Sequence, residues 1–494
     1  MRILLASSEV HPYSKTGGLA DMVAALGKAL ARSGNQIGIF TPLYRGIAER
    51  FAGLRRTGLR LELPLGSKTV RAAIWTLQVE PNLDIYFLDT PEFYQRPELY
   101  QENGVDYPDN AERFIFFSKA IVSLGQREEF QPEIIHLHDW QTGFAALFLH
   151  QAKAASVGRA VPRTCMTLHN LAYQGLFPAS QYGLTNLPRD YFTPNGVEFY
   201  GQICCLKAGI VYADAITTVS PRYAREITSP EFGSGLDGLM RQRQSSLAGI
   251  LNGVDYEEWN PLKDAYLLHS FSAKNLGGKA ANKRALQWEL GLPQEPRVPL
   301  FGNIGRLVEQ KGVPILLSAL EQVLQANIQF VQLGNGEPSY EESFQQLAAR
   351  LPSRCAVRIG FDEGLSHRLE AACDFYVMPS RFEPCGLNQM YSLRYGTVPI
   401  VRAVGGLDDT IIDVRQNAES ANGIKFNEYS SQALAKAFRK ALALYKEPEL
   451  FQRFRANGMS ADFSWKRTAE QFVQVYHRVL GKSELQPSMA TPLS

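Results

Sequence analysis

The sequence predicts an α/β protein made of two doubly wound domains, each built on a parallel sheet. Its 494 residues exceed the roughly 250–300 that one hydrophobic core usually supports, so two large domains are expected. Short apolar runs alternate with helical stretches along the first half, and the same alternation begins again near residue 299. Such alternation is typical of βαβ units, which assemble into parallel sheets covered by helices.

The first half opens with a strand, a glycine turn and a helix. Residues 2–6 form an apolar run, Gly17 and Gly18 form the turn, and apolar residues recur at helical spacing through 19–33. A second strand is expected at 36–40. Later apolar runs predict further buried strands at 85–88, 134–137, 165–168 and 215–219.

The second half repeats this organisation after a polar segment at 249–261, where we place the hinge. Its apolar runs predict strands at 299–304, 328–333, 357–359, 375–378 and 398–401, with a helix at 314–324. The expected parts are an N-terminal Rossmann-like domain at 1–250, a C-terminal Rossmann-like domain at 251–463, a helix at 464–481 that packs back on the N-terminal domain, and a disordered tail at 482–494.

Composition excludes several classes of partner. With 51 basic and 49 acidic residues, the formal net charge of +2 is too small to attract nucleic acid or an anionic membrane. No apolar run reaches the roughly 18 residues of a membrane span. Six cysteines are scattered along the chain, and the adjacent Cys204 and Cys205 are poorly placed for a structural disulfide. We therefore expect a cytoplasmic protein with reduced thiols and with no nucleic-acid or membrane partner.

The turn at Gly17 and Gly18 is the clearest candidate binding element. Adjacent glycines let a ligand approach the backbone, and the helix that follows turns its free N–H groups toward an anion. Lys15 adds a mobile positive charge. The spacing fits neither the dinucleotide fingerprint nor the Walker loop. The turn therefore predicts a phosphate-bearing ligand at the first helix.

Glycine loops also follow strands in the second half, at 302–306, 334–336 and 405–406. Since open parallel sheets bind ligands beyond the carboxyl ends of their strands, we expect loops of both domains to face one ligand in a shared cleft. Arg306 and Lys311 follow the first of these strands and could clamp a diphosphate. The alternative is a pair of solvated surface charges, the commoner role of basic residues.

A metal site is not expected from the histidines of the first half. His136, His138 and Asp139 lie together at the end of a strand, but no third ligand type follows at a recognisable spacing. We interpret them as polar groups that face the cleft.

Two further strand ends leave their assignment open. His169 either contacts a ligand or is satisfied by local hydrogen bonds. Glu383 either acts in a reaction or caps the helix that begins near Gly386. Cys385 has no accompanying signature of a nucleophile, so we interpret it as a small packed residue.

Five segments, taken in this order, resemble bacterial glycogen synthase and plant starch synthase. They are residues 15–21 (KTGGLAD), 138–142 (HDWQT), 169–175 (HNLAYQG), 252–255 (NGVD) and 383–387 (EPCGL). Residues 106–114, 206–210 and 463–465 agree with the same family. The resemblance covers nearly the whole chain.

The resemblance implies a GT-B fold, in which two Rossmann-like domains face a deep cleft, and a retaining glucosyltransferase. It implies ADP-glucose as donor and the non-reducing end of an α-1,4-glucan, such as glycogen, as acceptor. We expect no metal or other cofactor, because protein cations supply the charge. The implied catalytic residues are Asp139, His169, Arg306, Lys311 and Glu383. The implied donor-site residues are Lys15, Gly17, Gly18, Asp21, Asn252, Gly334, Gly336, Gly405 and Gly406.

Two loops depart from the family pattern. The loop from Gly334 to Glu337 lacks the Thr or Ser and then the Asp that are common there, and Val404 replaces a frequent Thr. Rival functions are another GT-B transferase using UDP-glucose or a different acceptor, and a glucan-binding regulator without catalysis. A glucan phosphorylase is a third, but no segment matches its pyridoxal-phosphate lysine site. Oligomeric state and product chain length are left open by the sequence.

Overall fold

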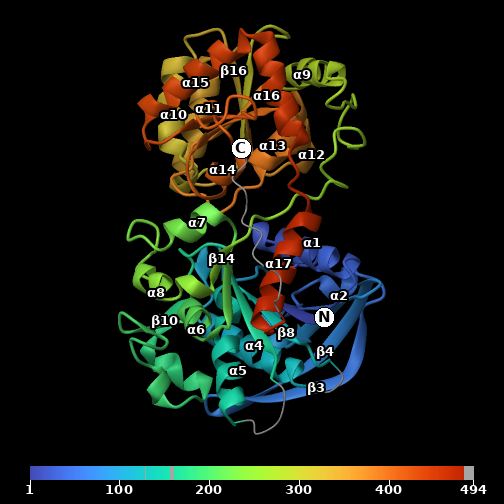
Figure 1. The fold of residues 1–494 in the computed structure, drawn as a ribbon, viewed down its shortest axis with the longest axis vertical. Helices are drawn as coiled ribbons and strands as arrows, with labels where there is room; N and C mark the ends of the chain where they lie inside the picture. Colours follow the sequence, from blue (N-terminus) through green and yellow to red (C-terminus); the bar gives the residue numbers. More distant parts are fainter. Residues whose placement is uncertain (128–129, 156–160, 483–494) are drawn as a thin grey trace. The chain divides into compact units, whose positions relative to one another are not determined.

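The computed structural model describes residues 1–127, 130–155 and 161–482. The chain divides into two compact units, which can be followed in Figure 1. The first contains residues 1–219 and 224–253 together with the helix that begins at Trp465, and the second contains residues 220–223 and 254–464. The tail expected at 482–494 lies outside the described residues except for Lys482.

A nine-stranded sheet forms the centre of the first unit. In spatial order its strands are β14 (Leu247–Gly249), β13 (Ala215–Thr218), β9 (Arg163–Leu168), β8 (Ile134–His138), β1 (Arg2–Ala6), β2 (Gln36–Pro42), β5 (Leu83–Asp89), β4 (Lys68–Glu80) and β3 (Arg55–Leu65). Neighbouring strands are parallel except at one edge, where β3, β4 and β5 pair antiparallel. The apolar runs predict the parallel strands but not the β3–β4 hairpin, because β3 buries only Leu61 and Leu65.

Helices and short strands surround this sheet. The helices are α1 (Gly18–Arg32), α2 (Ile47–Arg50), α3 (Pro91–Tyr94), α4 (Asn110–Gly125), α5 (Gly143–Ala155), α6 (Cys205–Tyr212), α8 (Asp237–Gln242) and α17 (Trp465–Val479). Helix α7 (Pro221–Glu226) is divided between the two units. Short 3-10 helices are η1 (Trp140–Thr142), η2 (Ala179–Thr185), η3 (Arg189–Tyr191) and η4 (Gln244–Ser246). Small sheets are formed by β10 (Leu176–Pro178), β12 (Gln202–Cys204) and β11 (Glu198–Phe199), and by β6 (Gln101–Glu102) and β7 (Val105–Asp106).

Helix α17 closes the first unit by packing against α1 and β9. Ala469, Phe472, Val475 and Tyr476 form its buried face, which repeats at helical spacing. The hydroxyl of Tyr476 lies 2.8 Å from Nδ1 of His136 on β8. The end of the chain is thereby joined to the central strands of the first sheet.

The second unit is built on a six-stranded parallel sheet. Its spatial order is β17 (Cys355–Ile359), β16 (Gln329–Gly334), β15 (Leu300–Ile304), β18 (Phe375–Met378), β19 (Val398–Arg402) and β20 (Ile424–Phe426). Counted along the chain, this order is 3-2-1-4-5-6, which is typical of doubly wound sheets. The first sheet reverses in the same way, with β1 lying between β2 and β8.

Helices cover the second sheet, and its strands are accordingly apolar on both faces. The helices are α9 (Gly277–Glu289), η5 (Glu309–Lys311), α10 (Val313–Val323), α11 (Pro338–Arg350), α12 (Glu363–Ala372), α13 (Asn388–Arg394), α14 (Gly405–Thr410), α15 (Ser431–Tyr445) and α16 (Pro448–Ser460). Phe301, Phe330, Phe375 and Phe438 lie in its core. Across the described residues of both units, no helix has the length and apolar character needed to cross a membrane.

A buried ion cluster ties two helices to the amino ends of the central strands in the second unit. Asp374, which precedes β18, accepts from Lys283 Nζ at 2.6 Å and from Arg455 Nη2 at 2.8 Å. It also accepts from the backbone N–H of Leu300 at 3.0 Å. The side chains of Lys283 and Asp374 are 6% and 7% exposed, so each charge depends on its partner.

Replacing Asp374 by Ala is expected to lower the free energy of unfolding of the second unit by about 3–5 kcal/mol, because Lys283 and Arg455 would stay buried without a counter-charge. Chemical denaturation followed by circular dichroism measures this loss. Glu321→Ala removes an ion pair with Arg350 in which both side chains are more than half exposed, and should cost at most about 1 kcal/mol. Equal losses in the two variants would contradict the argument.

Candidate active site

In each unit some of the predicted site residues follow the strands at which the sheet reverses its order. In the first unit Lys15 follows β1 and Asp139 directly follows β8. In the second, Arg306 follows β15 and Glu383 follows β18. Connections on the two sides of such a reversal leave on opposite faces of the sheet, which makes it the usual ligand site of this architecture. Each unit therefore carries part of its predicted polar set at its own switch point, whereas His169 follows β9 and Asn252 follows β14.

A buried carboxylate holds the glycine turn of the first unit. Glu9, which is 3% exposed, accepts hydrogen bonds from Thr16 N and Thr16 Oγ1, both at 2.6 Å, and from Gly17 N at 3.3 Å. The Tyr100 hydroxyl donates to it at 2.8 Å. Glu9 is a positioning residue. No sequence motif indicates this role, because the contact forms only when the chain folds so that Thr16 and Gly17 lie beside Glu9.

The two glycines of this turn are bordered by open space. A β-carbon on Gly17 or Gly18 would meet no atom within 4 Å, and neither residue has positive φ. Neither packing nor backbone conformation therefore requires glycine, whereas close approach of a ligand to the start of α1 would. Beside the turn, Lys15 Nζ lies 2.8 Å from Asp21 Oδ2, so these two predicted residues are in contact.

Asp139 has a strained backbone at the end of β8. Its φ of 57° and ψ of −175° fall in a region that residues other than glycine rarely adopt, and such strain is concentrated at functional sites. Its Oδ1 accepts from the backbone N–H of His169 at 2.8 Å, which brings two predicted residues together. Burial raises the pKa of Asp139 to about 7, against the lowering effect of the N–H groups of His169 and Asn170.

Three histidines lie in a layer beneath this carboxylate. His138 Nδ1 is 3.1 Å from His169 Nε2, and the two nitrogens of His136 are bonded to Tyr476 and Thr167 hydroxyls. His136 therefore offers no free lone pair to a metal ion. Burial lowers the pKa of His136 and of His169 to about 3, and lowers that of His138 well below its usual value. His169 is thus a neutral hydrogen-bonding group at pH 7.

Asn252 stands apart from these contacts in the loop after β14. It is 8% exposed, and its Oδ1 has no hydrogen-bond donor within the part of the chain that is described. A buried amide oxygen normally has a donor, so this one has capacity to accept from a ligand. The neighbouring Gly253 packs so closely on Trp465 that a β-carbon would lie 2.7 Å from its ring.

Arg306 is the exposed cation of the second switch point. It follows β15 and forms no ion pair with the residues described. Two predicted glycines support its turn: β-carbons on Gly334 and Gly336 would lie 1.9 Å from the carbonyl oxygen of Gly305 and 2.3 Å from that of Leu307. Backbone packing against the Arg306 turn therefore explains these glycines.

Lys311 and Glu383 form an ion pair at the same switch point. Lys311 Nζ lies 2.6 Å from Glu383 Oε2, and Ser380 Oγ donates to the same oxygen at 3.1 Å. The side chains are 27% and 7% exposed. Both of these bonds go to Oε2, so Oε1 of the carboxylate keeps capacity to accept from a ligand.

The glycine pair Gly405 and Gly406 packs against the backbone that carries Glu383. A β-carbon on Gly405 would lie 1.9 Å from Glu383 O, and one on Gly406 would lie 2.1 Å from Cys385 O. Gly405 also has φ of 44°, which favours glycine. Cys385 itself is 5% exposed, as expected of a packed residue.

Cys204 has a structural role that the sequence does not reveal. Its Sγ accepts from Lys207 N at 3.4 Å and so caps helix α6. Burial raises the pKa of its thiol to about 11, so the group is not a reactive thiolate.

Two family models match the chain, the starch synthase catalytic domain over residues 2–242 and the glycosyl transferases group 1 over residues 282–460. A glycogen synthase from Anaeromyxobacter sp. (strain Fw109-5) is 47% identical over 478 residues, which are 96% of this chain and 99% of that protein. A glycogen synthase from Myxococcus xanthus (strain DK1622) is 46% identical over 489 residues, 98% and 100% of the two chains.

Solved structures agree with this relationship. The catalytic domain of starch synthase IV from Arabidopsis thaliana, bound to ADP and acarbose, has a TM-score of 0.88 and 35% identity, covering 97% of this chain and 99% of that chain. Sucrose-phosphate synthase from Thermosynechococcus elongatus, at 20% identity over 97% of this chain and 99% of that chain, shares the fold with a TM-score of 0.61. The predicted GT-B fold is confirmed. The chain belongs to the family of bacterial glycogen synthases and plant starch synthases.

Proposed function

We propose that the chain transfers glucose from ADP-glucose to the non-reducing end of an α-1,4-glucan, with retention of anomeric configuration. The observation that carries the proposal is its similarity, along almost the whole chain, to glycogen synthases and to a starch synthase solved with ADP and acarbose. The polar groups at both switch points support it. Their cations and N–H groups suit a diphosphate, and their carboxylate oxygens can accept hydrogen bonds from sugar hydroxyls.

Cations of the second unit would stabilise the leaving diphosphate. Arg306 is exposed, and Lys311 is held in place by Glu383 at 2.6 Å. Negative charge grows on the leaving oxygen as the bond between glucose C1 and the diphosphate breaks, so these cations would bind the transition state more strongly than the ground state. We therefore propose that glucosyl transfer needs no metal ion or other cofactor.

In this scheme the first unit contributes Lys15 and the free N–H groups at the start of α1 to the diphosphate. His169, a neutral imidazole, would hydrogen-bond a sugar hydroxyl, and Asp139 and Asn252 would line the same site. The leaving phosphate would accept the proton of the attacking glucan hydroxyl on the same face of the sugar. Such front-face attack accounts for retention without a protein nucleophile.

We also propose that the protein works in the reducing cytoplasm. All six of its cysteines are buried thiols that form no disulfide. Thiols persist in this state in reducing compartments, whereas secreted proteins commonly use them as disulfides.

Donor choice tests the proposed reaction directly. With glycogen as acceptor, label from ADP-glucose should enter polymer at least ~10-fold faster, in kcat/KM, than label from UDP-glucose, a difference of about 1.4 kcal/mol in transition-state binding. Preference for UDP-glucose, or turnover that ignores added glycogen, would favour another GT-B transferase. Glucan binding without release of ADP would favour a non-catalytic regulator.

Removing either cation of the second switch point should slow transfer in a folded protein. Arg306→Ala and Lys311→Ala are each expected to lower kcat by about 10²–10³-fold, because each removes a group that stabilises developing charge. Glu383→Ala is expected to lower kcat by a similar factor, because it removes both the carboxylate that positions Lys311 and the Oε1 that can accept from a ligand. Arg381→Ala is the matched control, since its ion pair with Glu309 is more than half exposed, and it should retain activity within about twofold. Near-normal rates in Arg306→Ala would remove that residue from the mechanism.

The turn held by Glu9 should show a positioning effect. Glu9→Ala leaves Thr16 and Gly17 N–H groups without their acceptor and is expected to lower kcat/KM for ADP-glucose by ~10–100-fold through misplacement of the turn. Glu9→Gln should recover most of this loss, since its carbonyl can serve the two N–H groups and its amide can donate to the Thr16 and Tyr100 hydroxyls. Steady-state kinetics on variants with unchanged Tm measures both effects. Equal losses in the two variants would count against a positioning role.

A further inference from the structure

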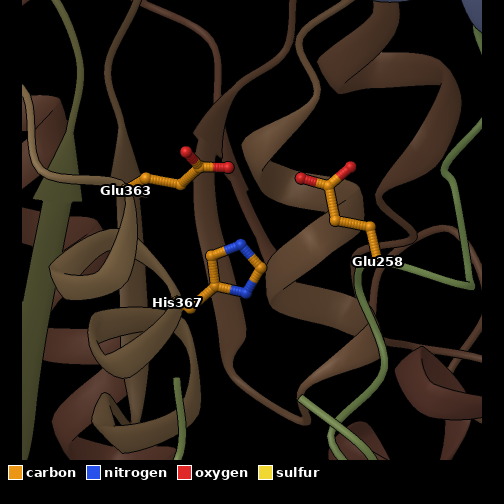
Figure 2. Close-up of side chains that lie close together, drawn as sticks. All are labelled: Glu258, Glu363 and His367. Carbon is orange, nitrogen blue, oxygen red and sulfur yellow. The ribbon is translucent and has the colours of Figure 1, made fainter. Parts of the chain in front are cut away.

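Three potential metal ligands converge in the second unit, among residues that the proposed transfer reaction does not use. Glu363 opens helix α12, His367 lies one turn later on the same helix, and Glu258 comes from the segment that leads into the unit. One ligand atom from each lies within 4.8 Å of the others. Figure 2 shows one ring nitrogen of His367 pointing into the space between the two carboxylates.

His367 is held so that its lone pair faces this space. Its Nδ1 lies 2.8 Å from Oδ2 of Asp264, and the side chain is 1% exposed. An ionised carboxylate can only accept, so Nδ1 donates to Asp264, and in the neutral ring Nε2 keeps its lone pair. Nε2 is buried and has no hydrogen-bond partner among the residues described. A buried ring nitrogen without a partner requires an explanation.

The ring is also fixed in orientation. The Trp259 ring stacks on the His367 ring with 3.8 Å between ring centroids and an interplanar angle of 11°. It stacks on the Tyr391 ring with a centroid distance of 3.8 Å and an angle of 3°. Asp264 in turn accepts from the Tyr395 hydroxyl at 2.5 Å and from its own loop at Tyr266 N at 2.9 Å. The nitrogen that faces the carboxylates is therefore preorganised by stacking on one side and by a carboxylate on the other.

We propose that Glu258, Glu363 and His367 Nε2 bind a divalent transition-metal ion, with Zn²⁺ the best match. A carboxylate oxygen cannot donate to Nε2 of His367, whereas a cation held between this nitrogen and the two carboxylates would give the nitrogen a partner. An imidazole nitrogen with two carboxylates suits Zn²⁺ better than Mg²⁺ or Ca²⁺, which prefer oxygen ligands throughout. Asp264 has the place of the second carboxylate that orients a metal-binding histidine.

The proposed ion has a structural role. It joins the segment around Glu258, just after the chain enters the second unit at Val254, to the first turn of α12. Both glutamates are exposed, so the ion can enter from solvent and keep water as further ligands. Because it binds the folded unit and not the unfolded chain, its binding should raise the stability of that unit.

Isothermal titration of tag-free, chelator-treated full-length protein with Zn²⁺ tests the proposal. We expect saturable binding of one ion, weakened at least about tenfold in Glu258→Gln/Glu363→Gln, because each replacement removes an anionic ligand. The matched control is Glu428→Gln/Glu449→Gln, which alters one exposed loop glutamate and one exposed glutamate in the first turn of α16. The control variant should bind Zn²⁺ as the unaltered protein does. No saturable binding, or equal affinity in the two double variants, would overturn the site.

A second measurement identifies the nitrogen ligand without altering the buried histidine. Long-range ¹H–¹⁵N NMR should show His367 Nε2 without a proton and shifted on addition of Zn²⁺, while Nδ1 stays protonated. Zn²⁺ should also raise Tm, and chelator should reverse the rise, in the unaltered and control proteins, with a smaller rise in Glu258→Gln/Glu363→Gln at the same Zn²⁺ concentration. A proton retained on Nε2 at saturating Zn²⁺, or displacement of Zn²⁺ by equimolar Mg²⁺, would contradict the proposal.

Discussion

The reversal of strand order in each sheet is the constraint on which the rest of the structure depends. Parallel strands covered by helices on both faces bury their own side chains, so functional groups have to follow the last residue of a strand. His138 ends β8 and is fully buried, whereas the next residue, Asp139, is only partly buried. After β18 the chain runs from Met378 at the end of the strand to Glu383, a buried carboxylate that is ion-paired with Lys311. In the sequence this geometry produces an apolar run followed by a polar residue.

The two units stabilise their switch points by different means. In the first unit, carboxylates hold the loops in place. Glu9 accepts hydrogen bonds from N–H groups of the turn, and Asp139 accepts one from His169 N, which follows the neighbouring strand. In the second, backbone meets backbone, because glycines at 334 and 405 remove the β-carbons that would keep the loops apart. The first arrangement leaves open space beside the glycines at the start of α1. In the second, glycines pack closely against the backbone next to Arg306 and against that of Glu383.

These differences decide what could be predicted from the sequence. Most parallel strands were predictable because burial on both faces makes them continuous apolar runs. The three-residue edge strand β20 was not predicted, and neither was β3, because only one face of β3 is covered. The glycine loops were predictable as loops. The sequence does not show that Gly17 borders open space whereas Gly334 packs against backbone, because both are simply glycines after a strand. Glu9 carries no motif.

The cluster around His367 could not be predicted for a further reason. Its parts come from two stretches, one near Glu258 and one on α12, and the contact between His367 and Asp264 spans 103 residues. Ligand spacing in sequence reveals a metal site only when the ligands share a local motif. Here one pair, Glu363 and His367, has helical spacing, which alone is too common to indicate a ligand set.

Strand β18 shows how one fold separates stability from chemistry. At its amino end Asp374 accepts from Lys283, Arg455 and Leu300 N, which together occupy both of its oxygens. Beyond its carboxyl end Glu383 accepts from Lys311 and Ser380 through one oxygen, and the other keeps its capacity. A saturated carboxylate gains nothing from a ligand and holds the helices together. A half-satisfied carboxylate beside a cation can still exchange a partner, so the carboxyl end of the strand is the end able to act on a substrate.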